Sequence, residues 1–225
     1  MINFDDLDVL AVSPLFAGIE KKSLDRLLAC LDARWVQSEK GAYLLQVGDK
    51  PRLGVLLSGQ AQIIREDFWG NRSVLAQIGP GELFGEAFCF AGVTSLPLSV
   101  QAQTATRQLF LAGEKLLNPC ERPCPFHTQL IRQMIAVLAG KNVMLTGKIA
   151  HMSGKTTRDK LLSYLSAQAD LAGSPAFTIP FDRQGLADYL AVDRSAMSAV
   201  LSQMRDQGLI AYRKNRFILL KESQD

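Results

Sequence analysis

Three polar side chains, Arg194, Ser195 and Ser198, are spaced so that one face of a helix would present them together. An arginine guanidinium can form two hydrogen bonds to guanine O6 and N7, and a serine hydroxyl can bond to a base edge or a phosphate. Asp193 directly precedes them and suits a helix start, because its carboxylate can accept from free backbone N–H groups. The sequence therefore predicts a helix after Asp193 whose exposed face could read DNA.

Two helices joined by a tight turn are predicted around these residues. The turn falls at Ala191-Val192, and the second helix should end near Gly208. Apolar side chains spaced three and four apart would face the core; these are Leu186, Ala187, Leu190, Met197, Val200, Leu201 and Met204. This layout, followed by a short basic strand hairpin, is typical of a helix-turn-helix whose second helix enters a major groove.

Charge gathers in the same segment. The whole chain of 225 residues carries only +3, whereas Arg194 to Arg216 holds five basic residues against one acidic residue, or +4. A local basic face beside a helix-turn-helix favours phosphate contact, although an ordinary solvated face would have the same composition. We expect Arg183 in the first helix, with Lys214 and Arg216 in the hairpin, to bind phosphates and orient the protein.

Composition restricts the class of protein. The length is enough for two ordinary domains, and four cysteines are too few for a disulfide scaffold in a chain of this size. The first ten residues carry acids and do not resemble an export signal. No apolar run approaches the roughly 20 residues needed to span a bilayer. A reduced, cytoplasmic protein that does not associate with membranes is therefore expected.

The first half of the chain predicts a β domain. Between Trp35 and Leu111, short runs rich in Val, Leu and Ile alternate with glycines, which is typical of a sandwich or small barrel. The expected strands are Ala42–Leu45, Leu53–Leu57, Gln60–Glu66, Ser73–Ile78, Ser99–Ala105 and Gln108–Ala112. An amphipathic helix starting at Ser23 should precede them.

A long helix should connect the two halves, because no strong breaker separates Pro125 from Gly154. Its apolar positions follow a heptad, at Ile131, Ile135, Leu138, Asn142, Leu145, Ile149 and Met152. Such a stripe suits a two-stranded coiled coil, in which a single Asn142 would set register and oligomer state. The alternative is that the stripe packs on the β domain of the same chain. His151 to Lys155 would be either a hinge centred on Gly154 or a plain interhelix turn.

The order of these parts resembles the CRP/FNR family of bacterial transcription regulators. The motifs that carry the resemblance are GAYLLQVGDKPRLGVLLSGQAQII, IGPGELFGEAFCF and LADYLAVDRSAMSAVLSQMRDQGLIAYRKNRFIL. The resemblance implies an α+β fold with an N-terminal double-stranded β-helix (jelly roll) in residues 1–119, which would be the effector-sensing domain. A central dimerisation helix and hinge would follow in residues 120–153, and a winged helix-turn-helix in residues 154–225.

The same resemblance implies a regulator without enzymatic activity. It would act as a homodimer on a palindromic operator, under allosteric control by a small molecule, with RNA polymerase as a possible further partner. Family members commonly carry an arginine that reads guanine where this chain has Ala199. The operator should therefore differ from the best-known family consensus, and Ala199 could contact a thymine methyl group.

The effector site departs from the cyclic-AMP-sensing members of the family. The resemblance places Gly85 and Glu86 against the ligand's ribose and phosphate, but Leu96-Pro97 stand where those members have an Arg-Ser pair for the phosphate. Two apolar residues, Val143 and Met144, align with the positions that contact adenine. Cyclic AMP is therefore not expected, and an aromatic or otherwise hydrophobic molecule fits better. An effector-independent regulator, with the pocket filled by side chains, stays open as the alternative.

Cysteine and histidine positions leave one further alternative. Cys120, Cys124 and His127 lie near the start of the long helix and could hold a soft metal or form a redox pair, although the set is incomplete. A metal-dependent barrel enzyme is disfavoured, because such a site needs several ligands inside the barrel and the two histidines, His127 and His151, follow it.

Overall fold

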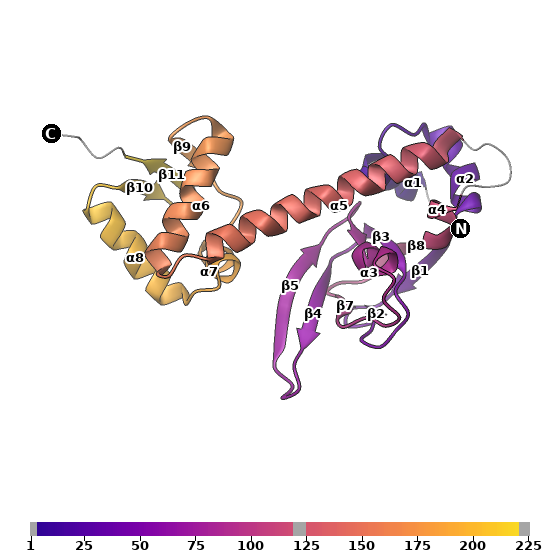
Figure 1. The fold of residues 1–225 in the computed structure, drawn as a ribbon, viewed down its shortest axis with the longest axis horizontal. Coiled ribbons are helices and arrows are strands. Elements are labelled where there is room, and N and C mark those ends of the chain that lie inside the picture. Colours follow the sequence, from indigo (N-terminus) through magenta and orange to yellow (C-terminus); the bar gives the residue numbers. More distant parts are fainter. Residues whose placement is uncertain (1–3, 119–124, 221–225) are drawn as a thin grey trace. The chain divides into compact units, whose positions relative to one another are not determined.

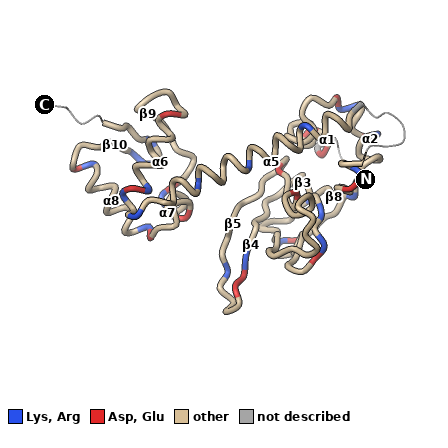
Figure 2. Tube along the Cα trace, viewed as in Figure 1, with Lys and Arg blue, Asp and Glu red and all other residues tan. Residues whose placement is uncertain are grey.

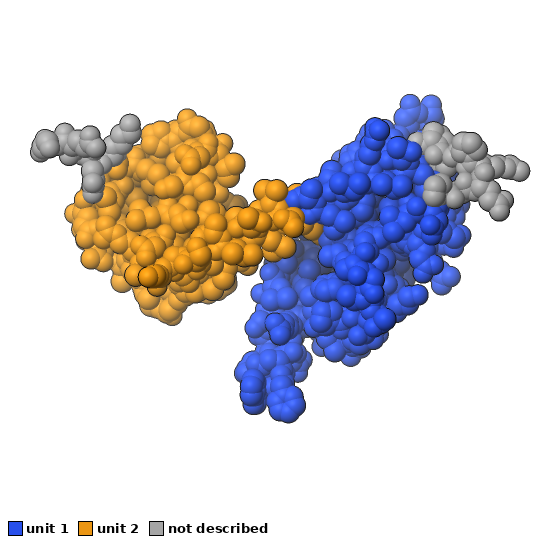
Figure 3. All heavy atoms as spheres, in the orientation of Figure 1, with its two compact units in different colours: residues 1–139 blue, residues 140–225 orange. Residues whose placement is uncertain are grey.

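The computed structural model describes residues 4–118 and 125–220. The chain forms two compact units, residues 1–139 and residues 140–225, which are coloured separately in Figure 3. The boundary falls inside one continuous helix, α5 (Pro125–Met152). Among the described residues, no helix is both long enough and apolar enough to cross a membrane.

Two four-stranded antiparallel sheets form the β part of the first unit (Figure 1). One has the order β1 (Arg34–Ser38), β8 (Thr106–Leu111), β3 (Leu53–Ser58) and β6 (Leu83–Phe84). The other has the order β2 (Tyr43–Leu45), β7 (Ser99–Ala102), β4 (Ala61–Glu66) and β5 (Arg72–Ile78). The predicted jelly roll and all six predicted strands are confirmed. Strands β1 and β6 were not predicted, because β1 shows no clear alternation and β6 has only two residues.

Strand β3 organises two apolar cores because both of its faces are buried. Leu53, Val55 and Leu57 face a cluster that includes helical residues, whereas Leu56 faces the interior between the two sheets. A strand buried on both faces reads as a continuous apolar run, and this one does. Helices α1 (Phe4–Val12), η1 (Pro14–Phe16), α2 (Lys21–Cys30), α3 (Glu86–Phe90) and α4 (Gly113–Leu117) complete the unit. Helix α2 is the predicted amphipathic helix and begins two residues earlier than expected.

The edge strand β5 is unusually open to solvent. It pairs only with β4, and six of its seven residues are exposed. The register shifts between Ile63 and Ile64, whose partners are Ala76 and Val74, so Leu75 is an extra residue on the outer strand. This arrangement is a β-bulge, which bends the strand and interrupts its ladder.

The apolar stripe of α5 divides into two parts. Leu130 and Met134 are buried in the core of the first unit, and Ile131 and Leu138 pack partly against it. The alternative of packing within one chain is therefore correct for this part of the helix. Three other positions of the stripe, Ile135, Leu145 and Ile149, are 61%, 61% and 68% exposed. Asn142 is also exposed.

The second unit contains three helices beyond α5 and a three-stranded sheet. Helix α6 (Thr157–Ala172) begins with a capping box, in which Thr156 and Asp159 each bond to the other's backbone N–H at 3.1 Å. Helices α7 (Arg183–Leu190) and α8 (Arg194–Asp206) follow strand β9 (Ala176–Thr178). Strands β10 (Ile210–Arg213) and β11 (Arg216–Leu219) form a hairpin, here called the wing, and β11 also pairs with β9.

The end of α5 is packed rather than free. His151 lies edge-on to the Tyr164 ring at 5.6 Å and its Nδ1 is 3.2 Å from Ser163 Oγ, both on α6. Burial lowers the pKa of His151. A Cβ atom at Gly154 would come within 2.8 Å of the Lys160 backbone nitrogen, so this glycine is needed for close approach. Gly154 thus lies in a closely packed turn between α5 and α6.

Candidate nucleic-acid interface

Aspartates begin both helices of the helix-turn-helix. Asp193 accepts a hydrogen bond from the Ala196 backbone N–H at 2.7 Å, and Asp182 accepts one from Gly185 at the same distance. Each carboxylate replaces a missing intrahelical partner and complements the positive end of its helix dipole. The predicted start of α8 is thus confirmed. The turn also lies where it was expected, with Ala191 in the left-handed conformation at the end of α7.

One face of α8 is buried in the core of the second unit, and the opposite face is accessible to a ligand. Met197, Leu201 and Met204 are fully buried against α6, α7 and the wing, as the apolar spacing predicted. Arg194 and Ser195 are therefore exposed on the other face, together with Ala199. Ser198 is only half-exposed, and its hydroxyl donates to the Arg194 carbonyl oxygen at 2.9 Å. Because the Ser198 hydroxyl proton is used in this intrahelical hydrogen bond, Ser198 in this rotamer could only accept a hydrogen bond from DNA.

Three of the six predicted DNA-binding residues converge on one open hollow of about 630 Å³. Arg183, Arg194 and Lys214 line it, and they come from α7, α8 and the tip of the wing. The Asp182 carboxylate also lines the hollow, so its charged lining is three cations and one anion. This net positive charge can attract phosphate oxygens. Arg216 lies apart from them, on the outer face of the wing sheet beside Arg213. The basic positions of this unit are marked blue along the trace in Figure 2.

Arg183, which the sequence predicted to bind phosphate and orient the protein, also packs on two aromatic rings. Its guanidinium lies 4.8 Å from the centroid of the Tyr212 ring and 5.2 Å from that of Phe217. Both rings belong to the wing, so Arg183 connects the start of α7 to it. Burial lowers the pKa of Arg183, and the nearby Tyr212 acts in the opposite direction.

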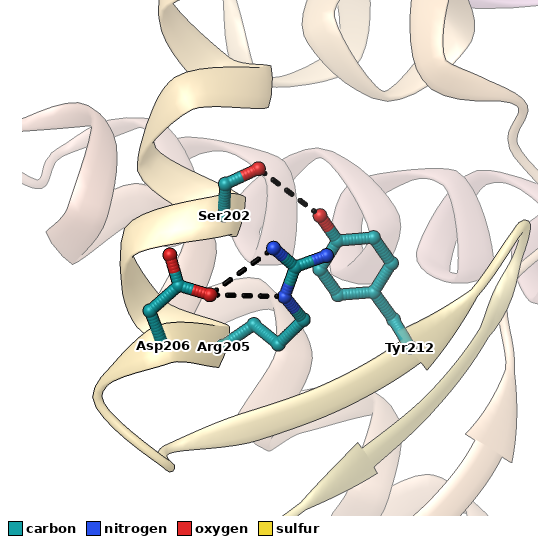
Figure 4. A network of polar contacts seen from close by, with 4 residues as sticks. All are labelled: Ser202, Arg205, Asp206 and Tyr212. Carbon is teal, nitrogen blue, oxygen red and sulfur yellow. Dashed lines mark hydrogen bonds and ion pairs between the residues drawn. The ribbon is translucent and has the colours of Figure 1, made fainter.

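A polar network at the base of the wing was not predicted (Figure 4). The Tyr212 hydroxyl lies 3.5 Å from Ser202 Oγ on α8. Arg205 donates from Nε and Nη2 to Asp206 Oδ1, each at 3.1 Å, and its guanidinium lies 5.8 Å from the Tyr212 ring centroid. The position of Tyr212 within β10 could indicate from the sequence that its side chain faces the core. No sequence pattern indicates its contacts with α8.

The predicted effector residues differ in burial and are divided between the two units. Leu96 is only 2% exposed and belongs to the interior cluster between the sheets, whereas Pro97 is exposed. The backbone explains the burial, because Leu96 exchanges hydrogen bonds with Gly48 and Asp49, each at 2.9 Å. Val143 and Met144 are exposed in the second unit. Of the predicted pair, Leu96 therefore faces the interior between the sheets, and Pro97 faces solvent.

Gly85 and Glu86 occupy a tightly constrained turn at the start of α3. Gly85 has a φ of +77°, and a Cβ atom there would lie 2.2 Å from the Arg52 carbonyl oxygen. Glu86 is buried. The backbone geometry alone thus requires glycine at position 85, with or without a ligand.

The metal or redox alternative cannot be assembled from the described residues. Cys120 and Cys124 lie outside them. His127 is buried, and its Nε2 is 2.9 Å from the Lys115 carbonyl oxygen on α4. Within residues 4–118 and 125–220, no group of three or more His, Cys, Asp or Glu side chains could hold a metal ion.

Comparison with known proteins gives two family matches. The cyclic nucleotide-binding domain matches residues 35–122, and the Crp-like helix-turn-helix domain matches residues 159–224. No curated protein sequence matches the chain.

Solved structures share the fold over most of the chain. The c-di-GMP responsive global regulator CLP from Xanthomonas campestris is 18% identical with a TM-score of 0.58, covering 90% of this chain and 100% of its own. CprK complexed with OCPA is 16% identical with a TM-score of 0.63, covering 86% and 88%. DNR from Pseudomonas aeruginosa is 22% identical with a TM-score of 0.50, covering 100% and 97%. Together with both family matches, the jelly roll, long helix and winged helix-turn-helix show that the chain belongs to the CRP/FNR family of transcription regulators.

Proposed function

We propose that the protein binds a palindromic operator as a homodimer and regulates transcription rather than catalysing a reaction. The convergence of Arg194 and Lys214 on one hollow beside the exposed face of α8 is the observation that carries the proposal. In this assignment residues 1–119 sense an effector, residues 120–153 dimerise and residues 154–225 bind DNA. Selection of bound sequences from random DNA is the experiment that tests it, because a palindromic consensus requires a symmetric pair of recognition helices.

Exposed apolar side chains on α5 support dimerisation. Exposure of Ile135, Leu145 and Ile149 to water is energetically unfavourable. These three residues share one face of the helix with Asn142. We call these four residues the seam. A second copy of the helix would cover the seam in a parallel coiled coil, with the two Asn142 side chains facing each other.

Arg194 and Lys214 should have separable roles in DNA binding. We expect Arg194→Ala to weaken operator binding by about 1–3 kcal/mol and to relax sequence choice, because a bidentate contact to guanine is lost. We expect Lys214→Ala to weaken binding to all sequences and to reduce the salt slope by about one. Fluorescence anisotropy on the selected operator and on random DNA, over a range of salt, measures both effects. Equal losses on both DNAs for Arg194→Ala would contradict its assignment to a base.

A small-molecule effector other than cyclic AMP is the second part of the proposal. Leu96 and Pro97 provide no charged group for a cyclic phosphate, and the interior beside Leu96 is apolar. We therefore expect an aromatic or otherwise hydrophobic molecule to bind the first unit. The constitutive regulator remains the alternative, because Leu96 already fills part of that interior.

Thermal unfolding tests the effector assignment directly. Millimolar cyclic AMP should leave the melting temperature unchanged, whereas a ligand at 100 times its Kd stabilises the folded state by about 2.7 kcal/mol. A panel of aromatic carboxylic acids, with metals and haem included, provides the comparison. Stabilisation by cyclic AMP would contradict the proposal. No stabilisation by any compound, with DNA affinity unchanged, would favour the constitutive regulator.

A further inference from the structure

One wing side chain, Tyr212, is contacted by both helices of the helix-turn-helix. The guanidinium of Arg183 on α7 lies 4.8 Å from its ring centroid, and that of Arg205 on α8 lies 5.8 Å from it. The Tyr212 hydroxyl adds a contact at 3.5 Å to Ser202 on α8 (Figure 4). All of these contacts are made between residues of the second unit.

The two guanidinium groups are themselves held in place. Arg205 is oriented by its double contact with Asp206, and Arg183 also packs on Phe217 of β11. A cation over an aromatic face and a hydroxyl pair both depend on direction, unlike simple apolar packing. The contacts of Tyr212 therefore constrain the distance and the orientation of the wing relative to α7 and α8.

We propose that Tyr212, held by Arg183 and Arg205, is a positioning residue that keeps the wing in register with the recognition helix. The inference rests on the proposed DNA binding. Lys214 follows Tyr212 by two residues at the wing tip, and Arg194 begins α8 across the same hollow. A rigid duplex fixes the spacing between a phosphate and a base edge, so both residues engage together only when the wing is held correctly. Arg183 then acts through Tyr212 and not on a phosphate.

The test measures specificity rather than affinity alone. We expect Tyr212→Leu to raise the Kd for the selected operator about tenfold, while the Kd for random DNA of equal length changes less than about twofold. The salt slope on random DNA should stay constant, because no charge is removed. Tyr212→Phe keeps the ring and should restore most of the operator affinity. An unchanged operator Kd for Tyr212→Leu would overturn the proposal.

Loss of folded protein must be separated from loss of register. Unfolding raises both Kd values by the same factor, so an equal rise on operator and random DNA would overturn the positioning role. Arg205→Met is a second variant, because Arg205 is exposed and the core does not depend on it. It should also lower the specificity ratio. Lys155→Met, which removes an exposed cation elsewhere in this unit, is the matched control and should leave the ratio unchanged.

A double-mutant cycle tests whether Tyr212 determines how Lys214 engages the operator. If Tyr212 holds the wing, Lys214→Ala should cost less on the operator in the Tyr212→Leu background than in the natural protein. Equal fold-changes in the two backgrounds would show independent roles and overturn the proposal.

Arg183→Met distinguishes the two roles of that arginine. A positioning role leaves the salt slope on random DNA unchanged, whereas a direct phosphate contact would reduce it by about one and overturn this part of the proposal. If the natural protein bound neither DNA, the proposed function itself would fail, and that result differs from every variant outcome above.

Discussion

Replacing Leu145 and Ile149 together with glutamate is expected to convert the protein to a monomer and to weaken operator binding by about 100-fold or more. Both side chains lie in the seam and are largely exposed in a single chain, so the fold should tolerate the change. In a dimer they would be buried, where each large apolar side chain contributes about 1.5–3 kcal/mol and an ionised carboxylate is strongly disfavoured. Size-exclusion chromatography with light scattering measures the oligomeric state, and fluorescence anisotropy measures the operator Kd.

A matched control adds the same two carboxylates to α5 away from the seam. Ala136 and Ala150 are exposed and lie on other faces of the helix, so the variant with glutamate at both positions should remain a dimer. This control has the same net charge as the seam variant and a similar helix propensity. A seam variant that remained dimeric and bound the operator normally would exclude α5 as the dimer interface.

Gly85→Ala should destabilise the first unit by about 3 kcal/mol. A side chain in the left-handed conformation costs roughly 1–2 kcal/mol, and the new Cβ would also lie 2.2 Å from the Arg52 carbonyl oxygen. That oxygen belongs to the backbone beside β3, so the clash cannot be relieved by turning a side chain. Both tryptophans, Trp35 and Trp69, lie in residues 1–139, so tryptophan fluorescence during urea unfolding follows this unit alone.

Gly48→Ala separates the conformational cost of a positive φ from the cost of the steric clash. Gly48 has a φ of +89° but no atom within 4 Å of its missing Cβ, so alanine should cost only the conformational part, about 1 kcal/mol. A Gly85→Ala loss no larger than that of Gly48→Ala would mean that the turn before α3 relaxes easily. The close approach to Arg52 would then not be the reason for glycine at position 85.

Sequence patterns predicted the elements that are determined locally. Asp193 was expected to cap α8 because short polar side chains accept from the free N–H groups of a first helical turn, and this is what the structure contains. The left-handed turn at Ala191 and the capping box of α6 depend on neighbouring residues in the same way. The short apolar runs between glycines indicated the strands of the first unit before any partner was known.

Contacts between distant residues could not be predicted in the same way. Leu96 was expected at a ligand-facing rim, but hydrogen bonds to Gly48 and Asp49 hold it in the interior. Arg183 was expected to reach phosphate, and only the folded wing places two aromatic rings beneath it. In both cases the partners that hold the residue in place lie about 30 or more positions away in the sequence.

The bulge at Leu75 has a consequence for behaviour in concentrated solution. An edge strand with free N–H and C=O groups can recruit the edge of another sheet, and exposed strands of this kind promote aggregation. The extra residue on β5 breaks the regular spacing of these groups, so a second β5 could not form a continuous ladder beside it. Pairing between the β5 edges of two copies is thereby disfavoured, although each strand is otherwise long and exposed enough to invite it.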